Sequence, residues 1–362
     1  MEDLKTFLTN FDFEVRLGKS TFEKPQYSKY SKSFESLFLW CEKASHILYS
    51  EKAYDPFFLS DIEKKRGFSP SVSCEKPFTH MWWGAESSVQ LWELEKTINS
   101  KETSYNCRKD LGLEVKGSEL LFDKTDIGHL KVPFILKTFF GFSGKGISFI
   151  RSESEKEAIS PKAFPLLAEP ILQRVRDFGV FYEGDKKQIV QNLNDDKGQF
   201  KGVYLKEDFP EQELIFEKTA PVFKWYQKKF DIDSLQIDCF QYLDDGELKF
   251  NALCEVNHRR TMGNVATKIY HQFGNKSAVM AVVSKKKVRS FENHRAREIA
   301  LAALNYQSRA GVLCLSQVED DFQVFFIAEE SDRSLQHLIM SWWKCLRGEE
   351  HFSLPREFII NS

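Results

Sequence analysis

The sequence lacks the features that mark several common classes of protein. No apolar run is long enough to cross a membrane as a helix. The first residues, Met1–Lys5, open with acidic side chains and lack the long apolar core of a signal peptide. The 53 acidic and 51 basic residues nearly balance, so no net positive charge points to nucleic acid or an anionic membrane. We therefore expect a cytoplasmic protein with no nucleic-acid or membrane partner.

Several catalytic and metal-binding patterns are also missing. The seven cysteines are scattered between Cys41 and Cys345 and never form a CxxC pair. This spacing argues against a zinc site or a disulfide framework, and it indicates reduced thiols that serve as small buried side chains. We find no HExxH motif and no Ser/His/Asp arrangement. The sequence thus offers no sign of a zinc protease or a serine hydrolase.

The composition is that of a folded globular protein. The chain has 362 residues, of which 42% are hydrophobic, and it contains 33 phenylalanines, which suggests aromatic-rich cores. This length suits two domains, or one large domain with insertions. Hydrophobic periodicity and turn signals predict helices over 34–48, 87–96, 101–111, 216–230, 295–307 and 335–346. They predict strands over 132–137, 147–150, 166–172, 177–182, 233–242, 247–257, 311–317 and 323–328.

The most informative stretch runs from Cys254 to Gly263. In an extended strand alternate side chains share a face, so Glu255, Asn257 and Arg259 point the same way, about 6–7 Å apart. A carboxylate and an amide oxygen are ligands that suit Mg²⁺, and a guanidinium suits a phosphate or a carboxylate. The row predicts a site for a metal-bound phosphorylated nucleotide. An ordinary polar strand face at a sheet surface is the alternative.

A second carboxylate is expected opposite this row. The sequence Asp-Asp-Gly at 244–246 is a strong hairpin turn, and it folds strand 233–242 back against strand 247–257. This pairing brings Asp238 close to Glu255 across the ladder. Two facing carboxylates repel, and the pKa of one of them rises unless a cation lies between them. Mg²⁺ is the natural occupant, and two solvated surface acids are the alternative.

A glycine-rich turn at 141–146 lies between strands 132–137 and 147–150. Because a strand follows the glycines, the turn is neither a P-loop nor a dinucleotide fingerprint, which both need a helix at that position. The tip of a glycine-rich hairpin can instead fold over phosphates through its backbone N–H groups. Lys137, just before the turn, could neutralise such a phosphate. A flexible hairpin and a surface lysine are the alternative.

In their order along the chain, these segments resemble the ATP-grasp superfamily over residues 95–275. The order is Lys101 at a helix start, Lys137 before the glycines, Glu-Pro-Ile-Leu at 169–172, Asp238 on a strand, and the Glu-x-Asn-x-Arg row. The resemblance implies an α+β protein with the ATP-grasp fold, in which two α+β subdomains grip ATP, preceded by a divergent α/β N-terminal domain.

The resemblance also implies four units along the chain. These are an N-terminal domain at 1–112, a lid subdomain at 113–205, a C-terminal subdomain with the metal site at 206–290, and a C-terminal α/β extension at 291–362. The first hundred residues look irregular and show no opening strand with a glycine-rich turn. Neither the tail nor the segment Thr261-Met262-Gly263 has a motif that can be assigned.

Individual residues take roles from the same resemblance. Arg259 corresponds to the residue that holds the terminal phosphate or the acyl-phosphate, and Lys137 shares the catalytic role with it. The metal ligands correspond to Asp238, Glu255 and Asn257. The ATP contacts correspond to Lys101, Lys137, Gly141, Ser143, Gly144, Gly146, Glu169, Ile171 and Leu172. The substrate contacts correspond to Arg174, Arg176, Asp177 and Arg260.

The chemistry implied is ligation that depends on ATP and Mg²⁺. The γ-phosphoryl group passes to a carboxylate, giving ADP and an acyl-phosphate, and an amine or a thiol then displaces phosphate. We expect ATP, two Mg²⁺ ions that Mn²⁺ could replace, and small-molecule carboxylate and amine substrates. The alternatives are an ATP-dependent phosphotransferase on the same fold and a non-catalytic nucleotide-binding protein.

Overall fold

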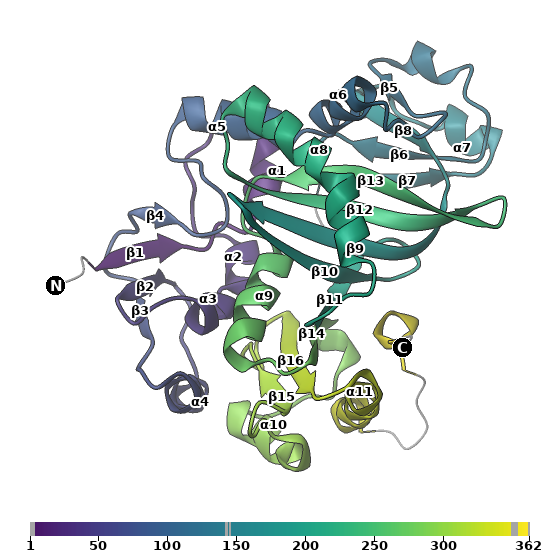
Figure 1. The fold of residues 1–362 in the computed structure, drawn as a ribbon. Coiled ribbons are helices and arrows are strands. Elements are labelled where there is room, and N and C mark those ends of the chain that lie inside the picture. Colours follow the sequence, from purple (N-terminus) through teal and green to yellow (C-terminus); the bar gives the residue numbers. More distant parts are fainter. Residues whose placement is uncertain (1–3, 142–143, 145, 349–353, 361–362) are drawn as a thin grey trace.

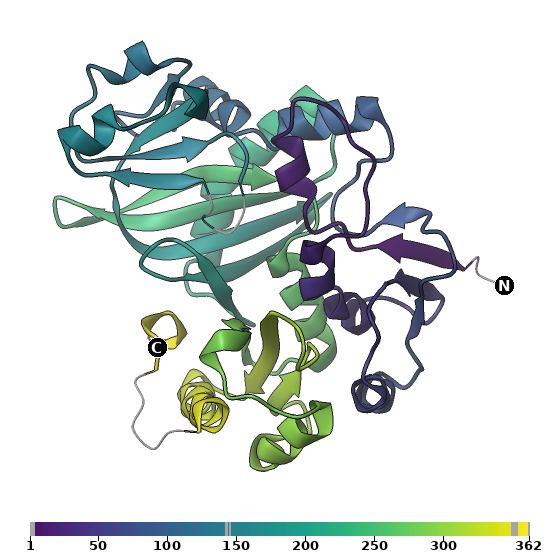
Figure 2. The same ribbon diagram turned by 180° about the vertical axis from the view of Figure 1, so that it is seen from behind.

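The computed structural model describes residues 4–141, 144, 146–348 and 354–360. The chain builds a small N-terminal sheet, a second small sheet and a large central sheet (Figure 1). Seen from behind, the two small sheets lie on opposite sides of the central sheet, with the C-terminal helices below them (Figure 2). Within the described residues, no helix combines the length and the apolar character that a membrane crossing requires.

The N-terminal sheet has four short strands, and all its pairs are parallel. In spatial order they are β3 (Ser71–Ser73), β2 (His46–Tyr49), β1 (Lys5–Leu8) and β4 (His80–Met81). The helices between them are α1 (Phe13–Leu17), α2 (Lys29–Phe34), α3 (Ser36–Cys41) and α4 (Pro56–Arg66). The α/β character expected for this region is thus confirmed.

Two expectations for the N-terminal region are wrong. The chain opens with a strand, and no single helix covers 34–48. Helix α3 ends at Cys41 because Glu42 has extended backbone angles (φ −99°, ψ 164°), and strand β2 begins at His46. Strands of two to four residues are too short to show the apolar alternation that marks a strand in a sequence.

The second sheet, called the lid sheet below, is antiparallel. In spatial order its strands are β5 (Glu119–Leu121), β8 (Leu166–Pro170), β6 (Phe134–Thr138) and β7 (Ile147–Ile150). The predicted hairpin around the glycine turn is confirmed, with Lys137 paired opposite Ile147. A separate core supports this sheet, formed by Leu121, Ile127, Phe134, Leu136, Ile150, Leu166 and Ala168.

The central sheet has eight strands, and all its pairs are antiparallel. In spatial order they are β13 (Glu247–Asn257), β12 (Ser234–Asp244), β9 (Gln173–Glu183), β10 (Lys186–Asn194), β11 (Phe200–Lys206), β14 (Ser277–Ser284), β16 (Phe322–Glu329) and β15 (Gly311–Cys314). The predicted turn between β12 and β13 is confirmed, because Asp245 and Gly246 both have positive φ, as a tight hairpin turn requires.

The central sheet crosses two of the expected unit boundaries. The boundary after residue 205 falls within β11, and the one after residue 290 falls between β14 and β16, which pair along their full lengths. Helices α8 (Gln212–Phe230), α9 (Met262–Phe273), α10 (His294–Ala300) and α11 (Asp332–Arg347) pack around this sheet. The division of the chain into four units remains a prediction.

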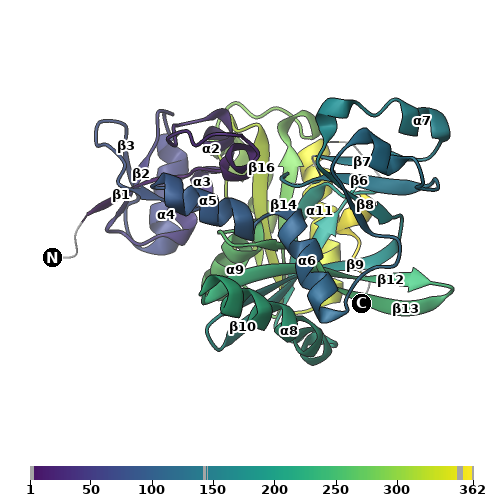
Figure 3. The same cartoon turned by 90° about the horizontal axis from the view of Figure 1, so that it is seen from above.

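Helices α5 (Val89–Ile98) and α6 (Lys101–Leu111) link the N-terminal region to the lid sheet. Figure 3 shows α6 between the N-terminal helices and the lid strands. The predicted ends of α6 are confirmed. Ser100 Oγ accepts a hydrogen bond from the Glu102 N–H at 3.1 Å, and Gly112 ends the helix with φ +65°. These caps place Lys101 in the first turn of the helix.

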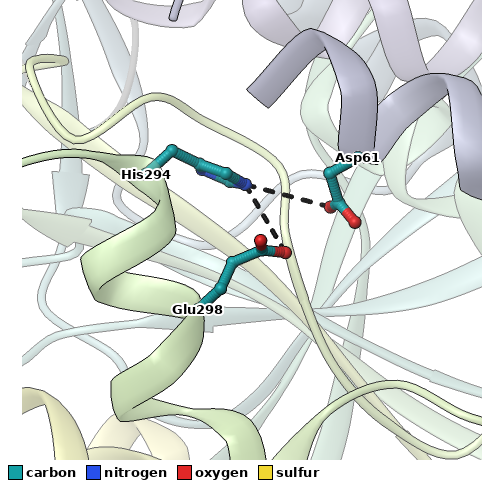
Figure 4. A group of neighbouring side chains, drawn as sticks. All are labelled: Asp61, His294 and Glu298. Atoms are coloured by element: carbon teal, nitrogen blue, oxygen red, sulfur yellow. Dashed lines mark ion pairs between the residues drawn. The ribbon is translucent and has the colours of Figure 1, made fainter. Parts of the chain in front are cut away.

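A buried cluster, defined by Asp61, His294 and Glu298, joins α4 to α10 (Figure 4). His294 Nε2 lies 3.9 Å from Asp61 Oδ2 and 3.6 Å from Glu298 Oε1. The spacing would admit a metal ion, but Arg297 Nη2 lies 3.0 Å from the other ring nitrogen, Nδ1. This guanidinium opposes any further cation at the ring, whereas the two carboxylates favour its protonated form. We therefore interpret the cluster as an ion-pair link between an imidazolium and two carboxylates, and not as a metal site.

This cluster predicts a pH dependence of stability. Burial lowers the pKa of His294, but Asp61 and Glu298 raise it further, and the net pKa lies above the ordinary 6.5. The folded protein therefore holds the proton more tightly than the unfolded chain does. The stabilisation is complete below about pH 6.5 and is lost as the pH rises through the folded pKa. Between about pH 6 and 9, wild type should lose more unfolding free energy than His294→Gln in urea titrations.

A matched control is His129→Gln, since His129 pairs with Glu119 on an exposed surface. Its pH profile should follow that of wild type, because an exposed ion pair contributes little to stability. Parallel profiles for wild type and His294→Gln would contradict the ion-pair interpretation.

Candidate functional site

A cavity of about 290 Å³ opens between the lid sheet, the central sheet and the N-terminal region. Its wall brings together many of the predicted site residues, namely Lys101, Lys137, Gly144, Arg174, Asp177, Asp238, Glu255, Asn257 and Arg259. The wall crosses the central sheet from β13 and β12, through β9 and β10, to β11, β14 and β16. One end of the cavity is therefore charged, and the other end rests on strands from the last third of the chain.

Two facing carboxylates form the charged end of the cavity. Asp238 pairs directly opposite Glu255 on β13, as the sequence predicted. Asp238 Oδ2 accepts a hydrogen bond from Asn257 Nδ2 at 2.9 Å, and Asp238 Oδ1 accepts one from Gln236 Nε2 at 2.5 Å. A register shift just after Asp238 turns the next residue, Cys239, toward the cavity as well.

The two carboxylates have opposite pKa shifts. Burial and the charge of Glu255 raise the pKa of Asp238 to about 7. Burial also acts to raise the pKa of Glu255, but Lys101, whose Nζ lies 2.6 Å from Glu255 Oε2, brings the net pKa below its usual value. Glu255 thus has a cationic partner, whereas Asp238 has only the neutral amides of Asn257 and Gln236. Two carboxylates and an amide oxygen in this state fit a hard divalent cation such as Mg²⁺.

A buried group of two cations and one carboxylate lies at the base of the lid sheet. Glu169 pairs through Oε2 with Lys137 Nζ at 2.5 Å and through Oε1 with Arg108 Nη1 at 2.5 Å. Burial acts to raise the pKa of Glu169, but the two cations lower it to about 2. The assignment of Glu169 to the ATP contacts stays a prediction, and its side chain holds Lys137. The group keeps one net positive charge beside the cavity.

Arg108 was not among the predicted site residues. Its only signal is the spacing of seven residues, or two helical turns, from Lys101 on the same helix, which places both side chains on one face. Cys254 was also not assigned, and its Sγ lies 3.7 Å from Lys137 Nζ and 3.5 Å from Arg174 Nη2. The role of both residues can be recognised only from the folded structure, in which α6 and β13 lie beside the lid strands that carry Lys137 and Glu169.

Arg259 forms a buried ion pair with Glu14 of α1. Its guanidinium also lies 5.5 Å from the centre of the Trp83 ring and donates to the Arg260 carbonyl at 2.9 Å. Its Nε is buried and has no hydrogen-bond partner. Burial raises the pKa of Glu14 even though Arg259 opposes that shift. No sequence signal could have found Glu14, since it lies 245 positions before Arg259 and follows no motif.

The predicted substrate residues divide into two pairs. Arg174 and Asp177 line the cavity and bind each other at 2.7 Å. Arg176 points instead to Glu211, with Nη2 2.6 Å from Oε1. Arg260 donates from its backbone N–H to the Trp83 carbonyl at 2.8 Å and from Nε to the Trp82 carbonyl at 3.1 Å. Arg176 and Arg260 therefore lie outside the described cavity wall, and their contact with substrate remains a prediction.

The glycine turn is described only in part. Ser143 lies outside the described residues, as do its neighbours Phe142 and Lys145. Gly144, which lines the cavity, has φ +73°, and a Cβ there would lie 2.8 Å from the Gly198 carbonyl oxygen. A side chain at this position would clash with the turn between β10 and β11. The close approach explains why glycine occupies the position.

Several residues assigned to ATP do not line this cavity in the described part of the chain. Ile171 and Leu172 follow β8, where Ile171 is largely exposed. Gly141 lines a small adjoining pocket together with Lys101 and Glu255, and Gly146 packs against Thr138. Their roles in nucleotide binding stay predictions.

Thr261, to which the sequence assigned no role, caps helix α9, because its Oγ1 accepts a hydrogen bond from the Asn264 N–H at 3.2 Å.

Comparison with known proteins gives two kinds of result. No family model matches the chain, and no curated protein sequence matches it. Solved structures do match. The N5-carboxyaminoimidazole ribonucleotide synthetase of Thermus thermophilus has a TM-score of 0.55 at 12% identity, over 96% of this chain and 99% of that one. The N5-carboxyaminoimidazole synthetase of Staphylococcus aureus, complexed with ADP, has a TM-score of 0.53 at 15% identity, over 95% and 98%.

A third match is the biotin carboxylase domain of the 2-oxoglutarate carboxylase of Hydrogenobacter thermophilus, in complex with MgADP, ADP and bicarbonate. Its TM-score is 0.50 at 14% identity, over 89% of this chain and 79% of that one. The matched proteins are ATP-grasp ligases. At such low identity the likeness concerns the fold, and it extends over nearly the whole chain. The chain therefore has the ATP-grasp fold.

Proposed function

We propose that this protein is a cytoplasmic ligase that uses ATP and Mg²⁺ to activate a carboxylate as an acyl-phosphate. An amine or a thiol then attacks this intermediate, and ADP and phosphate are released. The observation that carries the proposal is the pair Asp238 and Glu255, which face each other in a cavity also lined by Lys101, Lys137 and Arg259. Half-buried carboxylates that oppose basic groups across a cavity match the charge pattern of a metal–nucleotide complex.

The residues that would hold the metal are Asp238, Glu255 and Asn257. Two Mg²⁺ ions, or Mn²⁺ in their place, would neutralise charge on the β- and γ-phosphates when bound. Asn257 now donates its amide N–H to Asp238, and its amide oxygen is the atom suited to a cation. Glu255 now binds Lys101. When a cation takes this carboxylate, the lysine becomes available to a phosphate oxygen.

Lys137 and Arg259 would stabilise the charge that moves during phosphoryl transfer. Burial acts to lower the pKa of Lys137, but Cys254 and Glu169 bring it above its usual value, so the amine stays protonated. Because Arg108 shares Glu169, this group keeps one surplus positive charge. Arg259 has an unused buried N–H at Nε, which can donate to a phosphate or to the substrate carboxylate. Such a transfer depends on fixed positive charge and positioning more than on covalent help from the protein. The nucleotide-bound state of the matched synthetase and carboxylase domain supports this arrangement.

The metal assignment predicts the effect of removing one charge. Glu255→Gln keeps the side-chain size but removes a ligand, so the Mg²⁺ dependence of ADP binding should largely disappear. ATP turnover should fall by about 100-fold or more. Calorimetric titration of ADP with and without Mg²⁺ measures the first effect, and it needs no knowledge of the acceptor.

The control for this variant is Glu247→Gln, which changes an exposed carboxylate at the other end of the same strand. It should bind MgADP as wild type does. Turnover by Glu255→Gln within a few-fold of wild type would overturn the metal assignment. MgADP binding without turnover of any acid and amine would support the non-catalytic alternative.

The shared Glu169 predicts a rescue experiment. Arg108→Met leaves Glu169 to neutralise Lys137 alone, so the affinity for ADP should fall by about tenfold. The double variant Arg108→Met, Glu169→Gln restores the free charge of Lys137 and should recover most of that affinity. Lys109→Met changes the next, exposed residue of α6 and should have no effect. Failure of the double variant to bind more tightly than the single variant, with both folded by circular dichroism, would contradict this role of Arg108.

A further inference from the structure

The cavity extends beyond Arg259 into a part with a different lining. Six aromatic side chains, called the aromatic wall below, line this part: Phe11, Tyr30, Phe34, Trp83, Phe200 and Phe322. They come from the loop after β1, from α2, from the loop after β4, and from strands β11 and β16. Figure 3 shows α2 beside β16 at this end of the central sheet.

The aromatic wall is continuous with Arg259. The Arg259 guanidinium lies 5.5 Å from the Trp83 ring, whose centre is 4.3 Å from that of Phe11. The ring centres of Phe11 and Phe34 are 5.5 Å apart. Phe34 stacks on Phe322 with ring centres 5.2 Å apart and an interplanar angle of 15°. These contacts link four of the six wall residues in a row that runs from the Arg259 guanidinium to Phe322.

Hydrogen bonds behind the wall hold its first rings in place. Buried Asn10 accepts a hydrogen bond from the Trp83 N–H at 2.9 Å and donates to the Gly84 carbonyl at 2.8 Å. The Trp83 carbonyl accepts from the Arg260 N–H at 2.8 Å. Trp83 and Phe11 are each only 6% exposed. The wall is therefore preformed, which reduces the entropy lost when a ligand binds.

The charges around the wall limit what it can accept. In the described part of the chain, the basic residues of the cavity are Lys101, Lys137, Arg174 and Arg259, and none of them belongs to the aromatic wall. Each one is already paired with a carboxylate. A phosphate group needs cations or a helix N-terminus at its site. The six wall residues include no cation, and α2 has only six residues. The N-terminus of α9 also lines the cavity, but its capping residues Thr261 and Asn264 each accept a hydrogen bond from the other's backbone N–H. The wall suits a flat apolar group.

Arg259 supplies the matching polar anchor. Its side chain is 10% exposed, and its Nε lacks a hydrogen-bond partner although its other groups bind Glu14 and the Arg260 carbonyl. A buried donor without a partner costs free energy until a ligand satisfies it. A carboxylate that enters beside the aromatic wall can accept this hydrogen bond.

We propose that the aromatic wall binds the body of the acid that is activated, and that this acid carries an aromatic or other flat apolar group and no phosphate. The proposal rests on the proposed function, since that function requires a carboxylic acid. It also assigns a role to the C-terminal part of the chain, because Phe322 of β16 closes the far end of the wall. The acid would lie across the sheet from Arg259 toward β14 and β16.

The reaction can be followed without knowledge of the natural amine. The acid's carboxylate oxygen attacks the γ-phosphorus of ATP, the bond from that phosphorus to the β–γ bridging oxygen breaks, and ADP leaves. The nitrogen of added hydroxylamine then attacks the acyl carbon, loses a proton and displaces phosphate. The product is a hydroxamate, which forms a coloured complex with ferric ion.

The test compares acids that differ in their bodies. Phenylacetate, 4-hydroxyphenylacetate and L-phenylalanine represent aromatic acids, acetate and L-aspartate represent small or polar acids, and 3-phosphoglycerate represents phosphorylated acids. Binding to the full chain with Mg²⁺ and a non-hydrolysable ATP analogue is measured by calorimetry, and hydroxamate formation is measured with ATP. At least one aromatic acid should bind at least about tenfold more tightly than every polar or phosphorylated acid.

The two readouts separate this inference from the proposed function. Binding of aromatic acids without hydroxamate would support the wall and contradict the ligase. Hydroxamate from a polar or phosphorylated acid, with no binding of aromatic acids, would support the ligase and overturn the wall. Binding of MgADP together with no binding of any aromatic acid would also overturn it.

A pair of variants tests the wall directly. Phe322→Ala removes a ring that is 39% exposed and stacked on Phe34, so the fold should tolerate the change. The dissociation constant of the aromatic acid should rise by about tenfold, whereas that of MgADP should stay within about twofold. Phe57→Ala removes a ring that is 47% exposed and lies outside the cavity, and it should leave acid binding unchanged. Equal effects of the two variants would overturn the proposal.

Discussion

The pairing of Asp238 with Glu255 across β12 and β13 is the constraint on which the site depends. Two half-buried carboxylates in register repel each other and are not both readily charged without a cation. The protein compensates on one side with Lys101 and on the other with the amide groups of Asn257 and Gln236. These partners come from a helix cap, from the same strand pair and from a neighbouring position on β12.

The same kind of internal pairing recurs around the cavity. Each cation on its described wall has a carboxylate partner within the protein, as with Lys137 and Glu169 or Arg259 and Glu14. Paired cations avoid the cost of an isolated buried charge while no ligand is present. Arg108 leaves the Glu169 group with one surplus positive charge, and Arg259 keeps one N–H unused. An anionic ligand can use both of these features.

Three parts of the chain that lie far apart in sequence enclose the cavity. The lid sheet brings Lys137, the central sheet brings the carboxylates, and the N-terminal region brings Glu14 and four of the six residues of the aromatic wall. Buried packing holds them together, for example where Trp40 of α3 meets Phe273 at the end of α9, with ring centres 5.8 Å apart. The C-terminal strands extend the central sheet past β14 and complete the floor of the cavity.

The sequence by itself determined the features that depend on local spacing. The caps of α6, the turn between β12 and β13, and the register that faces Asp238 with Glu255 follow from short-range rules, because turn residues and alternation act within a few positions. The order of lysines, glycines and acids then sufficed to indicate the ATP-grasp fold. The helix expected over 34–48 failed because strands of four residues show no clear period.

Only the tertiary structure decided which residues meet across long separations. Glu14 reaches Arg259, Arg108 reaches Glu169, and Phe34 reaches Phe322, and no local pattern links the members of these pairs. Such partners meet because strand pairing and helix packing minimise the free energy of the whole fold. A single long-range contact of this kind has no local sequence pattern. The charged end of the cavity could therefore be predicted from motifs, whereas the aromatic end could be recognised only in three dimensions.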